Sequence, residues 1–586
     1  MVLPLKFQAT LRFPDISVKT QKMKYPGRKL FFLATALVGF GAANAQQWGD
    51  YTLYSVTGST TAYLIDTLNN NYHTWTGMTG NTAYSNYLLP GGTLLRTVRT
   101  TNSVFSGGGM AGRVQKVDYN NNLLWDYTYS TTTYCAHHDI CPMPNGNVLL
   151  IAYELKNAAA ATAAGSNYNG THWPDHIIEV QPTGATTGTI VWEWHLWDHL
   201  CQDDNPSSGN YVTNVADHPE LYDINTVTLT SMTKDFWHMN GIDYNPMLDQ
   251  IVVSAHNTDE FYVIDHSTTT AEAASHSGGR SGKGGDFLYR WGNPDRYDHS
   301  GTANFDVLHD AHWIPQGCPN AGMIVALNNK GISQTQSCVD GVLPPYSGFN
   351  YSYTPNVAYL PATYTFRQNC TGGTTNMGNS QQLPNGNTLI CLALSGVMYE
   401  IDPSGNTLWS KTASGSVAQA FRYSACQVTS AAPAIPTITA NGNVLTATSA
   451  TTYQWFVDGV LIPGATAQSY TATASGAYCV QVTDANGCWY SYSLLYDHTF
   501  ITGIDAFDQA HNLNVFPNPT DGMLNLSGEA LNGDFTVEVI DAAGRSVMKV
   551  NNQKIIDLTA FDNGMYVVNI TSESSGLITR RIVLNH

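Results

Sequence analysis

Charged residues are scarce in this sequence, and basic residues are the scarcer kind. Asp, Glu, Lys and Arg make up 12% of the 586 residues, and 26 Lys and Arg stand against 44 Asp and Glu, a formal net charge of −18. About a quarter of a typical soluble chain is charged. Such a surface repels nucleic-acid phosphates and anionic lipid headgroups, and no basic stripe offsets it. We therefore expect no nucleic-acid partner.

Apolar runs long enough to cross a membrane are missing as well. The apolar run at residues 30–41 is about a dozen residues long, whereas a helical span needs about 20. Basic residues precede this run, and an A-x-A sequence at 43–45 follows it, which is the pattern of a secretory signal peptide. We expect residues 1–45 to be removed after Ala45, leaving an exported chain without an integral membrane segment.

Cysteine spacings typical of zinc sites are absent too, because the ten cysteines include no Cys-x-x-Cys. In an exported chain, cysteines form disulfides more often than metal sites. Spacing along the sequence suggests three pairs: Cys135 with Cys141, Cys318 with Cys338, and Cys479 with Cys488. The sequence thus predicts disulfides, no metal site and no cofactor.

Long amphipathic helical patterns are missing, and a short repeat takes their place. Its first half is a strand, a turn of the type P-N-G-N or G-G and an apolar strand, found at residues 87–98, 141–154, 242–256, 311–329 and 381–393. Its second half is an apolar strand, a turn and a strand with Trp, found at residues 62–75, 113–127, 177–194 and 397–411. Each copy supplies about four short strands, which is the mark of a β-propeller blade.

The number of copies predicts the number of blades. Full copies begin near residues 84, 137, 238, 308 and 377, and the second half at 62–75 lacks its first half. Residues 418–428 are predicted to form the missing strand of this first blade. The last strand of the propeller then joins the first strands in one blade, and this closes the ring. We therefore expect an all-β fold with a six-bladed β-propeller over residues 46–430. An array of β-sandwiches is the alternative.

Two smaller β domains follow the propeller. Residues 431–500 alternate short strands around Trp455 and resemble the Ig-like spacer repeats of secreted Bacteroidetes proteins. Residues 505–586 contain P-N-P-x-x-G, D-x-x-G-R and a basic final strand, in that order. These motifs resemble the C-terminal sorting domain of the type IX secretion system. The resemblance implies a small β-sandwich, handling by the type IX machinery, and secretion or display on the cell surface.

Polar residues recur at the starts of the predicted innermost strands. They are His137 and His138 in CAHHDI, His238 in DFWHMN, His309 and His312 in LHDAHW, and Asn379 in NMGNS. Innermost strands line the central channel of a propeller, so these side chains are expected to converge on one site. A core histidine on each strand is the alternative.

These motifs together resemble the aryl-sulfate sulfotransferase family, six-bladed propellers that move sulfate between phenols, over residues 50–430. The resemblance implies that His309 is the nucleophile that becomes transiently sulfated, with His138 and His238 assisting. Asn328 and Asn329 stand at the family's D-N-G position. The implied partners are an aryl sulfate donor and a phenolic acceptor.

One position departs from the family. After IVVSA the family has an anion-binding Arg, and this chain has His256. A guanidinium is permanently charged, whereas an imidazole is charged only when its pKa allows. The other expected substrate-binding residues are His137, His312, Asn329 and Asn379. Three arginines are candidates to replace the missing one from elsewhere in the chain: Arg280, Arg290 and Arg422.

Other functions remain open at this level. A non-catalytic propeller displayed on the surface to bind glycans fits the same domain order. A metal-dependent hydrolase could use the same histidines as ligands. Two polar stretches, 195–210 with mixed His and Asp and 275–287 with many Gly, are expected to be solvated insertions, because neither has the spacing of a metal or phosphate motif.

Overall fold

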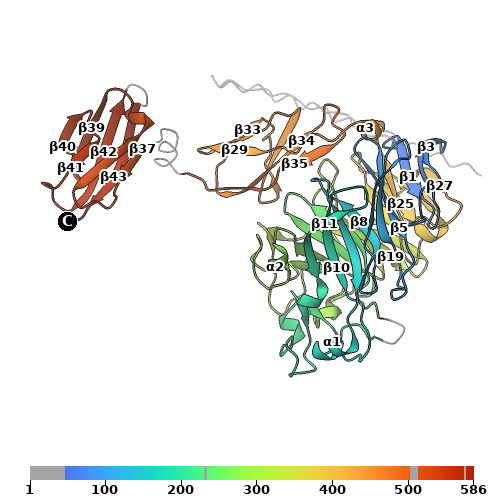
Figure 1. Ribbon diagram of the computed structural model, residues 1–586. Helices are drawn as coiled ribbons and strands as arrows, with labels where there is room; N and C mark the ends of the chain where they lie inside the picture. The colour runs from blue at the N-terminus through green and yellow to red at the C-terminus, as the bar shows by residue number, and fades with distance from the viewer. Residues whose placement is uncertain (1–45, 230–233, 502–512, 573–575) are drawn as a thin grey trace, which may run out of the picture. The chain divides into compact units, whose positions relative to one another are not determined.

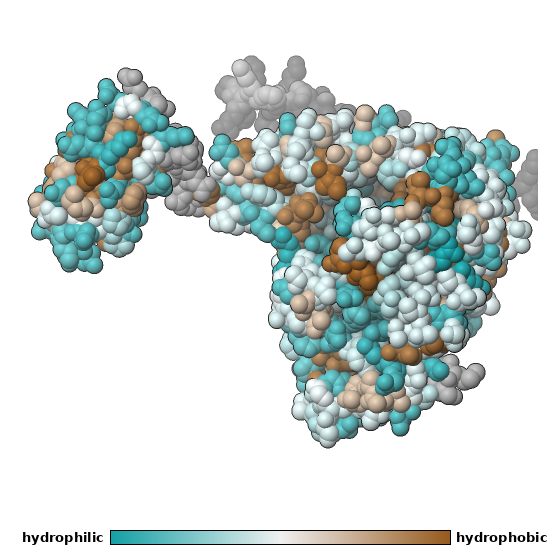
Figure 2. Space-filling model, in the orientation of Figure 1, coloured by the Kyte–Doolittle hydropathy of each residue, from teal (hydrophilic) through white to brown (hydrophobic). Residues whose placement is uncertain are grey.

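The computed structural model describes residues 46–229, 234–501, 513–572 and 576–586 (Figure 1). The signal peptide expected at 1–45 and the start of the sorting domain expected at 505 lie outside these ranges. Among the described residues, no helix is both long and apolar enough to span a membrane. On the face drawn in Figure 2, apolar residues are scattered among polar ones.

Six four-stranded antiparallel sheets form the propeller, as the repeat count predicted. The first three sheets are β28 (Ala420–Tyr423), β1 (Tyr51–Ser55), β2 (Ala62–Asp66) and β3 (Asn71–Trp75); β4 (Thr82–Leu89), β5 (Thr93–Arg99), β6 (Gly112–Val117) and β7 (Leu123–Thr128); and β8 (Tyr134–Pro142), β9 (Val148–Glu154), β10 (Asp175–Pro182) and β11 (Gly188–His195). The next three are β14 (Met239–Asn245), β15 (Gln250–Ala255), β16 (Glu260–Asp265) and β17 (Tyr289–Trp291); β18 (Leu308–Trp313), β19 (Ile324–Ser333), β20 (Gln336–Val342) and β23 (Phe366–Asn369); and β24 (Asn379–Gln382), β25 (Thr388–Leu392), β26 (Val397–Ile401) and β27 (Thr407–Thr412).

The ring closes as expected, because the last propeller strand completes the first sheet. β28 pairs with β1, with Tyr423 opposite Tyr51. Neighbouring blades hold β28 in place: the Leu88 amide donates to the Tyr423 hydroxyl at 3.0 Å, and the Asn379 side chain exchanges two hydrogen bonds with the Ala420 backbone, both of 2.9 Å. Closure therefore depends on side chains of the blades on either side of the first.

The recurrent Trp of the repeat links successive blades. Trp75 of β3 donates its indole N–H to the carbonyl of Asp118, beyond β6 in the next blade, at 2.8 Å. Trp125 of β7 does the same to the carbonyl of Thr187, in the turn before β11, at 3.0 Å. A buried indole needs a partner for its N–H. In these two copies of the repeat the Trp is thus an inter-blade contact, whereas the indole N–H of Trp409 in the last copy has no hydrogen-bond partner among the described residues.

Short elements occupy the insertions between strands. In the propeller they are α1 (Ala158–Ala163), η1 (Leu196–His199), β12 (Leu200–Cys201), η2 (Val215–Asp217), β13 (Tyr222–Asp223), α2 (Thr270–Ala273), η3 (Pro294–Tyr297), β21 (Tyr346–Ser347), β22 (Asn350–Tyr351) and η4 (Ala393–Ser395), and α3 (Ala425–Thr429) follows its last strand. The polar stretch at 195–210 begins at the end of β11 and runs into the insertion before β14, and the stretch at 275–287 lies in the insertion between β16 and β17.

Two β-sandwiches follow, each of two sheets. The first consists of β29 (Ile438–Asn441), β30 (Val444–Ala447) and β33 (Ser469–Thr471) on one sheet, and β31 (Thr452–Val457), β32 (Val460–Leu461), β34 (Gly476–Thr483), β35 (Tyr490–Tyr492) and β36 (Tyr496–His498) on the other. Trp455 is fully buried in its core, as expected. The second consists of β37 (Leu513–Phe516), β38 (Met523–Gly528) and β41 (Ile555–Asp557), and of β39 (Phe535–Ile540), β40 (Ser546–Asn551), β42 (Gly564–Ser572) and β43 (Gly576–Leu584), with η5 (Glu529–Leu531).

The three predicted disulfide pairs are wrong. The structure joins Cys426 of α3 to Cys488, and the cysteines of the other two pairs, together with Cys479, are free. Cys135 and Cys141 lie six positions apart on one strand, about 20 Å at strand rise, whereas bridged Cα atoms lie within about 7 Å. Cys479 packs against Phe456 in an apolar cluster. Spacing along the sequence did not reveal that Cys488 faces a different segment.

Candidate active site

The innermost strands bulge where the histidines stand. Pairing shifts register in β8 between Ala136 and Ile140, and in β14 between Met239 and Gly241. His138 (φ 47°) and His238 (φ 62°) have left-handed backbone at these places. A bulge re-aims side chains, and left-handed backbone in a non-glycine residue is typical of functional sites. Local distortion therefore turns these rings into the channel.

Four histidine rings form a continuous cluster, which we call the histidine cluster: His138, His238, His256 and His309. Ring centroids are 4.7 Å apart between His138 and His238, 5.3 Å between His238 and His256, and 5.7 Å between His256 and His309. His138 and His309 are buried, and the other two are partly buried. The expected nucleophile, its two assistants and the residue at the arginine position thus lie together.

His309 is held in one tautomer. Its Nδ1 lies 2.7 Å from Oδ1 of Asn329, whose amide nitrogen donates to the carbonyls of Thr374 and Met377 at 3.0 and 2.8 Å. These two carbonyls fix the amide, so Nδ1 of His309 is the donor and Nε2 carries the lone pair. That lone pair accepts from the Met377 amide at 3.1 Å. Burial, with the nearby His256, holds the pKa of His309 well below its usual value, so the ring is neutral.

His238 has the opposite charge preference. Its Nδ1 contacts Oδ2 of Asp235, which also accepts from the Tyr153 hydroxyl at 2.7 Å. Burial lowers the pKa of His238, but the Asp235 carboxylate outweighs burial, and the net direction is upward. The same pair keeps the pKa of Asp235 below its usual value, although burial opposes this. His238 is therefore the cation of the cluster.

His138 ends a hydrogen-bonded chain. Its Nδ1 lies 2.8 Å from Nδ1 of His137, whose Nε2 lies 2.7 Å from Oδ1 of Asp175. One proton bridges the two Nδ1 atoms, so the state of Asp175 sets the tautomer of both rings. If Asp175 is ionised, His138 Nε2 has the lone pair; if it is protonated, His138 Nε2 carries hydrogen. Burial raises the pKa of Asp175, and burial lowers that of His137 to about 3.

A run of three glycines packs on this cluster, and sequence reasoning missed it. A Cβ on Gly108 would lie 2.8 Å from the His238 ring, and a Cβ on Gly109 would lie 2.3 Å from the His138 ring. Gly109 also has a φ of 62°. A side chain at either position would displace a histidine, so the run SGGGMAG could have indicated close backbone approach.

The cation that the family resemblance calls for is not supplied by the three candidate arginines. Arg290 forms a buried ion pair with Glu260, Arg422 pairs with Glu400, and Arg280 pairs with Asp497. His256 itself donates from Nδ1 to Asn257 at 2.8 Å, and burial, with the charge of His238, lowers its pKa.

Lys330 lies close enough for its charge to act on His256. Its Nζ is 3.8 Å from Asp306. It directly follows Asn328 and Asn329 in the sequence, but nothing in the motif singled it out.

Two expected substrate-binding residues lie apart from the histidine cluster. The side-chain amide of Asn379 donates to the carbonyl of Ala420 in β28 and accepts from its N–H. His312 lies 3.2 Å from the Asp310 carboxylate, and although burial opposes it, the carboxylate raises the pKa of His312 to about 9. A second bulge, between His309 and His312, separates these two rings.

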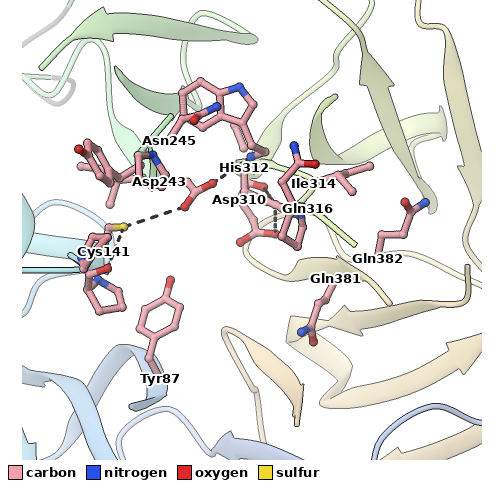
Figure 3. A pocket seen from close by; sticks show the side chains of 18 of the residues that line it. Tyr87, Cys141, Asp243, Asn245, Asp310, His312, Ile314, Gln316, Gln381 and Gln382 are labelled. Atoms are coloured by element: carbon pink, nitrogen blue, oxygen red, sulfur yellow. Dashed lines mark hydrogen bonds and ion pairs between the residues drawn. The ribbon is translucent and has the colours of Figure 1, made fainter. Parts of the chain in front are cut away.

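His312 instead lines a cavity of about 470 Å³ (Figure 3). Its walls come from the later residues of the innermost strands, including Cys141, Asn245, Trp313 and Gln382, whereas the histidine cluster lies at the beginnings of these strands. The cavity is thus at the other end of the channel. Figure 3 shows Asp243 and Asp310 pointing toward His312 within it.

The metal-hydrolase alternative needs convergent ligands in the channel. In the ranges that the structure describes, three ligand atoms within 4.8 Å of one another occur at His199, His276 and Asp286, outside the histidine cluster. The channel rings instead bond to each other, to Asn329 and to carboxylates. Their arrangement suits proton transfer and nucleophilic attack.

The fold is a six-bladed β-propeller with a cluster of four histidine rings at one end of its channel. Comparison with family models gives the particular family. Residues 46–281 match Arylsulfotransferase (ASST), and residues 514–585 match the Secretion system C-terminal sorting domain. Residues 46–281 are therefore similar to an arylsulfotransferase domain, and the type IX sorting domain indicates that the chain is exported to the cell surface or secreted.

The family match contains His138, His238 and His256 and ends before His309. No curated protein matches the sequence. Among solved structures, a Bacteroides caccae protein of unknown function is 12% identical, with a TM-score of 0.37, 64% of this chain covered and 98% of that chain. A putative 6-phosphogluconolactonase from Bacteroides fragilis is 10% identical, with a TM-score of 0.31 and the same coverages of 64% and 98%. These likenesses are too remote to indicate a function.

Proposed function

We propose that the chain transfers sulfate from an aryl sulfate to a phenol through a sulfohistidine at His309. The observation that carries the proposal is the fixed tautomer of His309. Asn329 accepts from Nδ1, and burial keeps the ring neutral, so Nε2 has the lone pair that attack requires. A neutral imidazole nitrogen can act as a nucleophile, and a neighbouring imidazolium, here His238, can donate a proton to the leaving group.

The two half-reactions balance on these groups. Nε2 of His309 attacks the sulfur of the donor, an N–S bond forms, and the S–O bond to the aryl group breaks. His238 gives its Nε2 proton to the leaving phenolate. In the second half, the acceptor phenol returns a proton to His238, its oxygen attacks the sulfur, and the N–S bond breaks.

The Met377 amide has a defined place in this scheme. It donates to the Nε2 lone pair at 3.1 Å, so it must leave that lone pair before the attack. Once the N–S bond forms, the same N–H lies next to the sulfuryl oxygens and can donate to them. Backbone donors aimed at developing charge are a strong source of transition-state stabilisation.

The test is the intact mass of the purified chain after incubation with 4-nitrophenyl sulfate. We expect a gain of about 80 Da and release of 4-nitrophenol, both absent in His309→Ala. His312→Gln is the matched control, because it changes a histidine of the same strand outside the cluster, and it should keep the gain. A folded chain with neither mass gain nor phenol release would overturn the proposal.

Two features that oppose catalysis favour a second candidate function. Met377 caps the nucleophile, and His256 replaces the family's arginine. Both fit a surface-displayed propeller that binds glycans without catalysis. The mass experiment separates the two candidates, because the binding propeller would form no covalent adduct.

A further inference from the structure

The two polar insertions come together in space. His199 ends η1, in the insertion that follows β11, whereas His276 and Asp286 belong to the glycine-rich segment after α2. Each of the three side chains presents a metal-ligand atom, and these atoms lie within 4.8 Å of one another. The segments are far apart in the sequence, so their meeting is a property of the fold.

Two imidazoles converge on one carboxylate oxygen. Oδ1 of Asp286 lies 2.8 Å from Nδ1 of His199 and 2.8 Å from Nδ1 of His276. The two rings are 5.8 Å apart, at an interplanar angle of 89°. In a tetrahedral zinc site with bonds of about 2.0–2.2 Å, neighbouring ligand atoms are about 3.3 Å apart. Each nitrogen is therefore within about 0.5 Å of the distance from the carboxylate oxygen that a zinc site requires.

The two ring nitrogens of His199 have different partners, and Nδ1 is the one that faces this carboxylate. Its Nε2 lies 2.8 Å from the carbonyl of Ala273, and because a carbonyl only accepts, Nε2 must carry hydrogen. Nδ1 of His199 is thus the ring nitrogen that is available to a metal ion beside Asp286. A backbone carbonyl on the second ring nitrogen is the usual support of a metal-ligating histidine.

The surrounding chain fixes the ligands in place. Trp194 stacks on the His199 ring, 5.4 Å away and within 3° of parallel, and donates its indole N–H to the carbonyl of Gly285 at 2.7 Å. A Cβ on Gly285 would lie 2.0 Å from the carbonyl of Ala273 and 2.6 Å from Nε2 of His199. Only glycine permits this approach. A ligand set held by neighbouring contacts binds metal more tightly than a loose one.

We propose that His199, His276 and Asp286 bind one divalent transition-metal ion of the zinc class. Two imidazole nitrogens and one carboxylate suit zinc, whereas calcium and magnesium take oxygen ligands. His199 and Asp286 are buried, but the His276 side chain is 62% exposed, so the ion is reachable and its fourth position is open to water. This site lies outside the histidine cluster and departs from the expectation of no metal. It ties the η1 insertion to the glycine-rich segment.

The test is zinc binding to the purified chain after dialysis against a chelator, followed by calorimetry and by the absorbance of the cobalt form. We expect one ion per chain, and His276→Ala should weaken binding by more than about 10-fold. That variant changes an exposed side chain, so it should fold. His218→Ala is the matched control, because the His218 side chain is 38% exposed and pairs with a single carboxylate, Glu220. It should bind zinc normally.

Thermal unfolding gives a second, independent measurement. Zinc should raise the Tm of the parent chain and of His218→Ala, and it should leave the Tm of His276→Ala unchanged. Equal zinc affinity in His276→Ala and the parent chain would overturn the proposal, because another of the 18 histidines would then be the site. Absence of zinc binding in the parent chain would also overturn the proposal, because hydrogen bonds alone would then join His199, His276 and Asp286.

Discussion

Residues of the same type take different chemical roles in this channel because their hydrogen-bond partners differ. His309 faces the amide of Asn329, which orients the ring without adding charge. His238 faces the carboxylate of Asp235, which stabilises the imidazolium. Burial acts on both rings in the same direction, so the partner decides. One neutral and one cationic histidine are what transfer of a sulfuryl group with protonation of the leaving group requires.

Replacing Asp235 by Asn tests the assignment of His238 as the acid. The amide keeps the shape of the carboxylate, but it no longer raises the pKa of His238, so the ring becomes neutral near pH 7. General acids contribute about 100-fold or more when the leaving group is basic. We expect a loss of about 100-fold with phenyl sulfate and a much smaller one with 4-nitrophenyl sulfate, measured as initial rates. Equal losses with both donors would contradict this role.

His256→Arg tests whether the family's missing charge limits the rate. The pKa of His256 is lowered by burial and by His238, so the ring is charged only below that lowered pKa and loses its charge as pH rises through it. Wild-type activity should therefore increase as pH falls below about 6.5, the ordinary pKa of histidine. Arg stays charged, so the variant should gain about 10-fold in kcat/KM at pH 7 and lose this acid dependence. His218→Arg, at a remote exposed position, should change neither property. An unaltered pH profile in His256→Arg would exclude His256 from sulfate binding.

At the scale of elements, the innermost strands have two roles. They contribute to closure of the propeller ring, and they carry histidines of the candidate site. His137 and His138 lie within the bulge of β8, and His309 directly precedes the bulge of β18, whereas Asn379 at the start of β24 bonds to β28. A polar residue at the start of an inner strand is therefore not always part of the site. The bulges decide which side chains enter the channel.

Asn379→Ala separates these tasks. It removes both side-chain hydrogen bonds to Ala420 and leaves the backbone N–H and carbonyl of Ala420 unsatisfied in a buried place. Such a loss costs about 1–3 kcal/mol for each group left unpaired. We expect a lower Tm in thermal unfolding with an unchanged KM for the aryl sulfate. A raised KM at an unchanged Tm would instead place Asn379 in substrate binding.

Much of the fold was predictable because the repeat is local in the sequence. Each hairpin carries its own turn residues and apolar alternation, so residues 84, 137, 238, 308 and 377 correctly marked the innermost strands. Contacts between distant segments were not predictable. Spacing did not reveal that Cys426 faces Cys488, or that His199 meets His276.

The histidines of the candidate site were predictable because they recur in a repeated motif. The residues that support them occur once each and were not predictable. His138, His238 and His309 occupy equivalent places in three blades, and the structure brings them together with His256. The groups that set their charges, Asp175 and Asp235, lie outside the repeated positions. His312 was grouped with His309 because the two are three residues apart, but the bulge between them sends the rings to different ends of the channel.

At the scale of the whole molecule, the proposed chemistry and the export signal belong to different domains. The arylsulfotransferase match lies within residues 46–281 and the sorting-domain match within residues 514–585, and no propeller strand uses a residue beyond Tyr423. The sorting domain has its own apolar core between two sheets, with Val537, Val568 and Ile582 fully buried. A domain with its own core can be removed without withdrawing side chains from the propeller core.

Deletion of residues 513–586 should therefore block export and leave the chemistry intact. In a host with a type IX system, we expect the shortened chain to accumulate inside the cell envelope, whereas the parent chain reaches the surface or the medium. Fractionation and immunoblotting measure this difference.

Lysates of the two strains should show equal 4-nitrophenol release per folded chain, because the histidine cluster contains no residue of the deleted part. Arg545→Ala, which removes an exposed ion pair with Asp541 in the sorting domain, serves as a fold-preserving comparison within it. Export of the shortened chain at the parent level would show that another segment carries the sorting information.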